Sequence, residues 1–329
     1  MTVHPRVADR FHLLDGITSF DHAMSDPVLA ERLHAFLQFR EAAPPPSAAT
    51  RPVDVPGPHG PVRVRVYEPL AYPPATSRPC LVWHHGGAFR MGDLDMPEAD
   101  RVAREVAVRS DAVVVSVDYR LAVDGVHYPV PLDDCVAAVR WVHDNAAAEL
   151  GVDPERISVG GASAGANLAT GAALRLRDED RWQPAALLAV YGVFHPRIPP
   201  ARATEQALLD EIPSVLRFTP ESTVDIATNY LGAPLSAATG FAMPALADLE
   251  GLCPTLLVSA EYDDLRPSGQ AFAAALATAG VEVRHVVAQG LLHGFLNLPS
   301  EIEPIADVLD LMSATVSTLP STARPVLVP

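Results

Sequence analysis

Short apolar runs alternate with amphipathic stretches along most of this chain, and this alternation predicts the secondary structure. Short runs of apolar, often β-branched residues indicate strands, and apolar residues on one helical face indicate helices. The expected strands are 62–67, 80–84, 112–117, 157–160, 185–191, 254–260 and 281–287, and the expected helices are 98–109, 131–148, 167–176, 267–279 and 302–316. Continuous apolar strands separated by helices predict a mostly parallel sheet covered on both faces, the α/β class.

Three regions depart from this alternation of strands and helices. Residues 1–43 have apolar positions at helical spacing, and Asp26-Pro27 suits the N-cap and first turn of a helix there. Residues 44–61 are rich in Pro, Gly, Ser and Ala, which is typical of a linker, and 62–67 alternates as a strand of an antiparallel edge pair does. Residues 195–246 contain helical pieces and no expected strand, so they form a long insertion.

Composition and charge exclude several classes of partner. The chain has 24 basic residues, all arginine, against 40 acidic ones, and its net charge of −16 argues against nucleic acid or anionic membranes. Cys80, Cys135 and Cys253 have no metal-binding spacing, so buried, reduced thiols are expected. We find no signal-peptide pattern and no apolar run of transmembrane length, so a cytoplasmic enzyme without stable membrane anchoring is expected.

The clearest motif is Gly161-Ala162-Ser163-Ala164-Gly165, a G-x-S-x-G pattern between an expected strand and an expected helix. In that context the pattern is typical of a nucleophile elbow. The turn is so tight that the residues two before and two after the serine must be small, because a Cβ there would clash with the strand or the helix. The turn should strain the backbone of Ser163, expose its hydroxyl above the sheet and place a helix N-terminus beneath it.

A glycine-rich loop is expected beside this serine, because functional groups of open α/β sheets gather at the carboxyl ends of the strands. The segment His84-His85-Gly86-Gly87-Ala88-Phe89 directly follows the apolar run 80–84. Consecutive glycines let backbone N–H groups point into a cavity, and the segment matches an oxyanion loop of the His-Gly-Gly type. The expected oxyanion donors are the amides of Gly86, Gly87 and Ala164, each worth on the order of 3 kcal/mol in the transition state.

Two further loops supply candidate acid–base groups. After strand 254–260 a buried carboxylate could orient an imidazole; Asp263 is the expected one, and Asp264 could instead cap the following helix. After strand 281–287, His293 lies next to a glycine in an expected loop over 291–297, which suits a proton shuttle. The chain order Ser163, Asp263, His293 is the order expected of α/β-hydrolases.

Five stretches together make the resemblance to a known family specific. They are HHGGAFRMGDLD at 84–95, VDYRLA at 117–122, YPVPLDDCVAAVRWV at 128–142, VGGASAGANLA at 159–169, and the pair AEYDDLR at 260–266 and LLHGF at 291–295. From about residue 60 to 298, the chain resembles the hormone-sensitive-lipase branch of the α/β-hydrolases, the bacterial family IV carboxylesterases.

The resemblance implies an α/β-hydrolase fold with a helical cap, in which Ser163 is the nucleophile, His293 the general base and Asp263 its partner, with Gly86, Gly87 and Ala164 as oxyanion donors. The implied segments are N-terminal cap helices and linker at 1–50, core at 51–194, cap insertion at 195–246, core at 247–318 and a tail at 319–329. The resemblance implies no metal or cofactor, and analogy with relatives suggests a homodimer through the last strand and the final helix.

Four positions depart from the family pattern. Ala88 stands for the third glycine of the oxyanion loop, and Ala162 for the acidic residue often found before the serine. Val123-Asp124-Gly125 replaces the usual Pro-Glu, and Asp264 replaces the proline after the catalytic aspartate. None of these changes removes a triad group, so they bear on substrate range more than on activity.

The expected function is therefore a serine carboxylesterase that hydrolyses short- to medium-chain acyl esters through an acyl-enzyme, since a covered pocket favours short chains. The apolar candidates for the substrate pocket are Phe89, Met91, Leu94, Tyr191, Phe194, Phe218, Tyr230 and Phe241. The same triad also allows an acyltransferase, or an amidase or lactonase. A further alternative is a non-catalytic ligand-binding protein on this fold. The plant hormone receptors that descend from the fold are of this kind; they keep the nucleophile elbow but lack the triad histidine.

Overall fold

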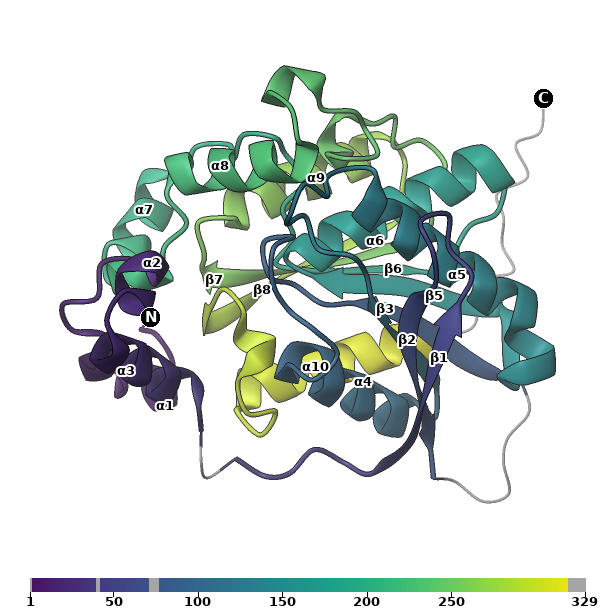
Figure 1. The fold of residues 1–329 in the computed structure, drawn as a ribbon, viewed down its shortest axis with the longest axis horizontal. Helices are drawn as coiled ribbons and strands as arrows, with labels where there is room; N and C mark the ends of the chain where they lie inside the picture. Colours follow the sequence, from purple (N-terminus) through teal and green to yellow (C-terminus); the bar gives the residue numbers. More distant parts are fainter. Residues whose placement is uncertain (1, 40–41, 71–76, 319–329) are drawn as a thin grey trace.

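One eight-stranded sheet with helices on both faces organises the computed structural model of the protein (Figure 1). The structure describes residues 2–39, 42–70 and 77–318. The strands lie in the order β1-β2-β4-β3-β5-β6-β7-β8; β2 is antiparallel to both its neighbours, and all pairs from β4 to β8 are parallel. Their bounds are β1 Ala48–Val55, β2 Val62–Pro69, β3 Arg78–His84, β4 Val113–Asp118, β5 Val152–Ala162, β6 Leu187–Val190, β7 Thr255–Tyr262 and β8 Val283–Leu292.

Helices cover the sheet in two layers, and successive side chains of a central strand face opposite layers. In β4, Val113 and Val115 belong to the apolar cluster that includes α5, α6 and α9, whereas Val114 belongs to the cluster with α4 and α10. The long helices are α4 Pro97–Ser110, α5 Val130–Glu149, α6 Ala164–Arg175, α9 Arg266–Thr278 and α10 Glu303–Ser317. The sheet is thus buried on both faces, as the continuous apolar strands predict.

The expected strands and helices are present, with two corrections. The segment expected to be a linker contains β1, which pairs with β2 and completes the antiparallel edge pair that the alternation in 62–67 predicts. A proline at position 52 is compatible with this strand because a residue without an N–H is tolerated at a sheet edge. The loop expected from Leu291 begins later, since β8 continues to Leu292, which pairs with Tyr262 after an irregularity in the ladder. The expected tail from 319 lies outside the described residues.

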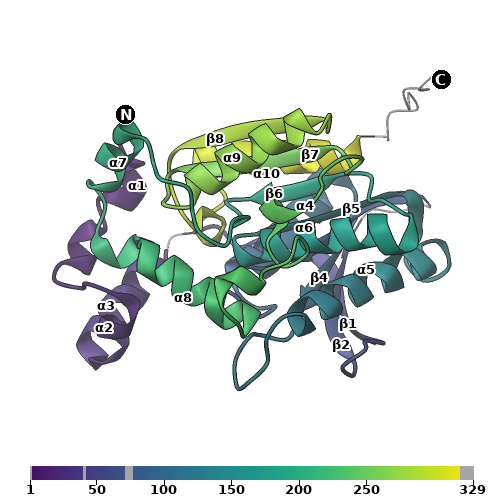
Figure 2. The same cartoon turned by 90° about the horizontal axis from the view of Figure 1, so that it is seen from above.

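The N-terminal residues form short helices, as expected: α1 Pro5–Ala8, α2 Phe20–Met24 and α3 Pro27–Leu37, with a 3-10 turn at Phe11–Leu14. The Asp26 carboxylate caps α3 by accepting hydrogen bonds from the amides of Val28 and Leu29, at 2.8 and 3.4 Å. Both views place these helices beside α7 Ala203–Leu209 (Figures 1 and 2), and the Ser214 hydroxyl donates to the Ile17 carbonyl at 3.4 Å.

The segment 195–246 contains helices and no strand, as the sequence predicts. After α7 the chain forms a 3-10 turn at Ser214–Leu216 and then α8 Pro220–Leu231, followed by 3-10 turns at Leu235–Ala237 and Pro244–Leu246. Seen from above, α8 runs from the N-terminal helices toward the middle of the sheet (Figure 2). This segment therefore contributes to the surroundings of the strand ends without extending the sheet.

The turn from β5 into α6 has the close backbone approach that the sequence predicts. Ser163 lies between them with φ 54° and ψ −117°, a strained conformation for a residue with a Cβ. A Cβ added to Gly161 would lie 2.3 Å from the carbonyl oxygen of Gly165, and one added to Gly165 would lie 2.1 Å from that of His84. Small residues at both positions are thus a steric requirement of the turn.

Replacing Gly165 with alanine should therefore destabilise the protein. The methyl group would collide with backbone of β3, which cannot move without disturbing the sheet, so we expect a loss of about 2–3 kcal/mol in the free energy of unfolding. Urea denaturation followed by circular dichroism measures this loss. Gly125→Ala is the control, because it adds a methyl group in open space at φ +83° and should cost only about 1 kcal/mol. A Gly165→Ala protein as stable as the control would contradict the steric argument.

Candidate active site

Ser163, Asp263 and His293 lie together at the carboxyl edge of the sheet, following β5, β7 and β8 respectively. The Ser163 Oγ lies 2.9 Å from His293 Nε2, and His293 Nδ1 lies 2.8 Å from Asp263 Oδ2. The ends of parallel strands meet at one edge, so residues separated by up to 130 positions form a hydrogen-bonded chain. A hydroxyl that donates to an imidazole held by a carboxylate is the arrangement of a nucleophile with its base.

The carboxylate of Asp263 fixes both the orientation and the charge of the imidazole. Asp263 is buried, and its second oxygen accepts a hydrogen bond from the Leu265 amide at 2.8 Å. Because the Nδ1–H of His293 donates to Asp263, its Nε2 is left to accept the proton of Ser163. Burial by itself would lower the pKa of His293, but Asp263 outweighs it with smaller contributions from Glu98 and Asp264, so the pKa is raised above its ordinary value.

Asp264, the alternative carboxylate, does something else. It accepts two hydrogen bonds of 2.9 Å from the guanidinium of Arg217 and one of 2.8 Å from the amide of Phe218. The expectation that Asp264 could cap the following helix is wrong, because α9 begins after Leu265 without a side-chain cap. Adjacent aspartates thus point to different partners, one to the imidazole and the other to the segment that leads into α8.

The glycine-rich loop corrects one expected oxyanion donor. The Gly86 amide donates to Glu98 Oε1 at 2.6 Å, so this N–H is already used and the expectation for Gly86 is wrong. The amides of Gly87, Ala88 and Ala164 donate to no acceptor in the part of the chain that the structure describes, and Ala88 and Ala164 line a cavity with Ser163. Ala88 was not among the expected donors; its φ of 54° is a left-handed conformation that favours glycine.

A buried carboxylate that the sequence analysis missed, Glu98, holds this loop. Only 2% of Glu98 is exposed, and besides Gly86 it accepts hydrogen bonds from the Tyr191 hydroxyl at 2.5 Å and the Asn297 side-chain amide at 3.3 Å. The Tyr191 ring lies 5.0 Å from that of His293, so Glu98 connects the glycine-rich loop to the surroundings of the imidazole. An acidic residue in the first turn of a helix is common, so nothing in the sequence marks Glu98.

Burial also keeps the hydrogen-bonding groups around the loop in their neutral states. Burial and the neighbouring Glu98 raise the pKa of Tyr191 well above its ordinary value, so the hydroxyl remains a donor. Burial lowers the pKa of His84 to about 4, although a hydrogen bond to the Gly160 carbonyl opposes the shift. Burial likewise lowers the pKa of His85, whose ring stacks on Tyr119 with centroids 4.5 Å apart. These two histidines are therefore neutral structural groups.

A cavity of about 20 Å³, room for about one water molecule, lies beside Ser163. Its lining consists of Ala88, Phe89, Ser163, Ala164, Val193, Phe218, Thr223, Ile226, Ala227, Met243 and Leu265. Of the eight expected pocket residues, Phe89 and Phe218 line it. The residues from α8 were missed, although their helical spacing places them on one face and could have indicated them.

The other six expected pocket residues do not line this cavity. Met91 is exposed, Phe194 stacks on Phe272 with centroids 4.3 Å apart, and Tyr230 stacks on Phe89 at 3.9 Å. Leu94 and Tyr191 are buried, and Phe241 packs against the core. Large apolar residues are usually core residues, and most of these six follow that rule.

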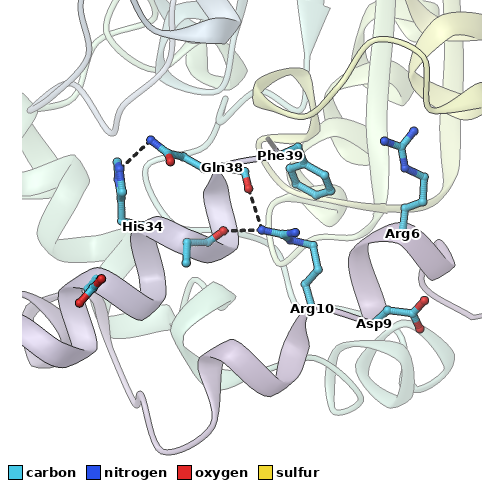
Figure 3. A pocket seen from close by; sticks show the side chains of 8 residues that line it. Arg6, Asp9, Arg10, His34, Gln38 and Phe39 are labelled. Carbon is cyan, nitrogen blue, oxygen red and sulfur yellow. Dashed lines mark hydrogen bonds between the residues drawn. The ribbon is translucent and has the colours of Figure 1, made fainter. Parts of the chain in front are cut away.

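A larger cavity of about 500 Å³ lies between α1 and α3 (Figure 3), and Arg10, one of the residues that line it, serves the fold. The Arg10 guanidinium donates to main-chain carbonyls of Ala35, Phe36 and Gln38 and lies 4.3 Å from the centroid of the Phe39 ring. It thus satisfies the carbonyl groups at the end of α3. None of the residues that line this cavity lines the one at Ser163.

The described part of the chain contains no cluster of three or more His, Cys, Asp or Glu side chains that could hold a metal ion. Across residues 2–39, 42–70 and 77–318, no helix has the length and apolar character needed to cross a membrane.

Comparisons with known proteins agree with this geometry. A family model described as alpha/beta hydrolase fold matches residues 81–297. The carboxylic ester hydrolase LipN of Mycobacterium tuberculosis is 34% identical over 84% of this chain and 72% of its own, and the carboxylesterase NlhH of the same species is 35% identical over 75% of each. A hyperthermophilic esterase from Pyrobaculum calidifontis has a structure similar to this one, with a TM-score of 0.82 at 30% identity over 96% of this chain and 98% of that one. The chain therefore belongs to the α/β-hydrolase family, in the branch of bacterial carboxylesterases that resembles hormone-sensitive lipase.

Proposed function

We propose that this protein hydrolyses carboxylic esters with short acyl chains through an acyl-enzyme intermediate on Ser163. The observation that carries the proposal is the unbroken chain of hydrogen bonds from the Ser163 hydroxyl through His293 to the buried Asp263. The similarity to LipN, NlhH and the Pyrobaculum esterase supports an ester as the substrate. The small cavity beside Ser163 supports a short acyl chain.

In the first half of the reaction, His293 Nε2 takes the proton of Ser163 as its Oγ attacks the ester carbonyl carbon. The resulting imidazolium is stabilised by Asp263, which stays ionised. Collapse of the tetrahedral intermediate breaks the bond to the leaving oxygen, and His293 returns its proton to that oxygen, which releases the alcohol. In the second half, water loses a proton to His293, attacks the acyl carbon and releases the carboxylic acid and Ser163.

The developing oxyanion is held by the amides of Gly87, Ala88 and Ala164 in this proposal. None of these three N–H groups donates to an acceptor in the described chain, and the Ala164 amide also opens α6, whose N-terminus favours negative charge. Glu98 fixes the loop by binding the amide of Gly86, so it acts as a positioning residue and not on the substrate.

Replacing Ser163 with alanine should lower kcat for p-nitrophenyl acetate by about 10⁶-fold, because the nucleophile is lost. The matched control is Ser259→Ala, which removes another Ser–His hydrogen bond, the 2.9 Å contact of the buried Ser259 Oγ with His285 Nε2, and should leave the activity unchanged. Turnover that persists without Ser163 would exclude the proposed mechanism.

The acyl preference is tested with p-nitrophenyl esters from acetate to palmitate. We expect the highest kcat/KM at the short end, and an optimum beyond about twelve carbons would contradict the size of the cavity. Added acceptor alcohols in the same assay distinguish hydrolysis from acyl transfer, since a transferase would convert most of the acyl groups to new esters. Anilides and lactones in the panel test the amidase and lactonase alternatives.

The pH dependence follows from the raised pKa of His293. Only the neutral imidazole can take the proton of Ser163, so kcat/KM should rise with pH and level off only above the ordinary histidine pKa of about 6.5. Asp263→Asn removes the charge that stabilises the imidazolium, so the acid limb should move to lower pH while kcat falls by about 10⁴-fold. The exposed Glu155→Gln is the control and should leave the limb in place. If the acid limb of the pH profile stays in place or moves to higher pH in Asp263→Asn, the role assigned to Asp263 is contradicted.

Glu98→Gln should lower kcat ten- to a hundredfold. The amide side chain of glutamine cannot accept from both the Gly86 amide and the Tyr191 hydroxyl, so one buried donor loses its acceptor, at a free-energy cost of about 1–3 kcal/mol. Glu105→Gln on the same helix is the control; Glu105 is also buried but pairs with Arg109, so its loss should leave kcat unchanged. Equal kcat values for the two variants would exclude a positioning role for Glu98.

A further inference from the structure

We propose that Asp264 is a specificity-determining residue that limits the size of the alcohol part of the ester, by fixing Phe218 against His293. The inference rests on the proposed function. Asp264 directly follows Asp263 in the chain, yet its carboxylate faces the segment before α8 and not the imidazole.

The first step is the way in which Asp264 holds that segment. Its two oxygens form a bidentate pair with the guanidinium of Arg217, at 2.9 Å each, and one of them also accepts from the Phe218 amide at 2.8 Å. The side chains of Asp264 and Arg217 are only 13% and 20% exposed, so solvent screens this pair less than a surface pair. Arg217 is tied at a third point, because it also donates to the Leu209 carbonyl at 2.7 Å.

The second step is the position of the Phe218 ring. Its edge-on contact with the His293 ring has a centroid separation of 4.7 Å, and Phe218 also lines the cavity at Ser163. The next residue, Thr219, caps α8 by accepting from the Ser222 amide, so the segment is fixed on both sides of Phe218. The Phe218 ring therefore forms a wall of the cavity, meaning one of its bounding side chains, and has little freedom to move away from it.

The third step connects this wall to one part of the substrate. His293 Nε2 must reach the leaving oxygen to protonate it, so the space next to the imidazole belongs to the alcohol of the ester. Phe218 lies against the imidazole ring and also lines the cavity, so a bulky alcohol next to the imidazole must displace the Phe218 ring to enter. Ser163 and Ala164 belong to the tightly packed elbow, whereas Phe218 is held by side-chain bonds that a substitution can remove.

The test compares acetate esters of ethanol, butanol, octanol and 2-naphthylmethanol, with the acyl group held constant. The wild-type enzyme should favour the ethyl ester. In Asp264→Ala and in Phe218→Ala, kcat/KM for the octyl and naphthylmethyl esters should rise about tenfold relative to kcat/KM for the ethyl ester. The double variant should show no further change, because both substitutions act through the position of the Phe218 ring. Asp210→Asn is the matched control; Asp210 is the exposed carboxylate 3.8 Å from Arg217, and its loss should leave the ratios unchanged.

Two further variants and a second panel keep the outcome clear. If Asp264→Ala does not fold, Arg217→Met removes the same bidentate pair, and Asp264→Asn should give an intermediate ratio since it keeps an acceptor for the Phe218 amide. If the ratios of kcat/KM between the alcohol esters are unchanged in the variants that fold, the inference is overturned. The proposed function would still stand in that case, provided that the wild-type enzyme hydrolyses ethyl acetate and needs Ser163 to do so. A shift in the acyl panel as large as the shift in the alcohol panel would overturn the assignment of Phe218 to the alcohol side. Absence of Ser163-dependent turnover would overturn both proposals.

Discussion

The close backbone contact between the start of α6 and the end of β3 is the constraint on which the site depends. Gly165 approaches the carbonyl oxygen of His84 so closely that it leaves no room for a methyl group. That approach forces Ser163 into a left-handed conformation, and the same contact brings the loop after β3 next to the serine. Nucleophile and glycine-rich loop are thus placed by one packing interaction, and the imidazole and carboxylate are added from the neighbouring strand ends.

Sequence reasoning predicted the elements that carry periodic signals. Continuous apolar strands, small residues around Ser163 and polar residues directly after apolar runs are local patterns, and the sheet, the elbow and the grouping of Ser163, Asp263 and His293 follow from them. The strand β1 was missed because Pro and Ala are typical of linkers, and only pairing with β2 makes the segment a strand. Its structure depends on a partner, which a local pattern does not reveal.

The errors within the site have the same origin. Gly86 was assigned as an oxyanion donor because glycine permits an outward N–H, but a carboxylate from the next helix binds that amide. Glu98 itself resembles any acidic residue near a helix start. Asp263 was correctly chosen over Asp264 as the partner of the imidazole, but the pairing of Asp264 with Arg217 was not foreseen. The roles that were missed depend on contacts between distant segments, which a local sequence pattern does not reveal.

The volume beside Ser163 also affects what ends the catalytic cycle. In the proposed mechanism, the second nucleophile approaches the acyl carbon along the path that the departing alcohol has just left, because the imidazole that activates it is the same one. A space that accommodates about one water molecule thus discriminates between competing acceptors by size. Water enters without moving any wall, whereas a larger alcohol must displace side chains first. The restriction that limits which ester enters therefore also disfavours acceptor alcohols larger than the one that has left, so that selection of the substrate and exclusion of bulky acceptors have one steric cause.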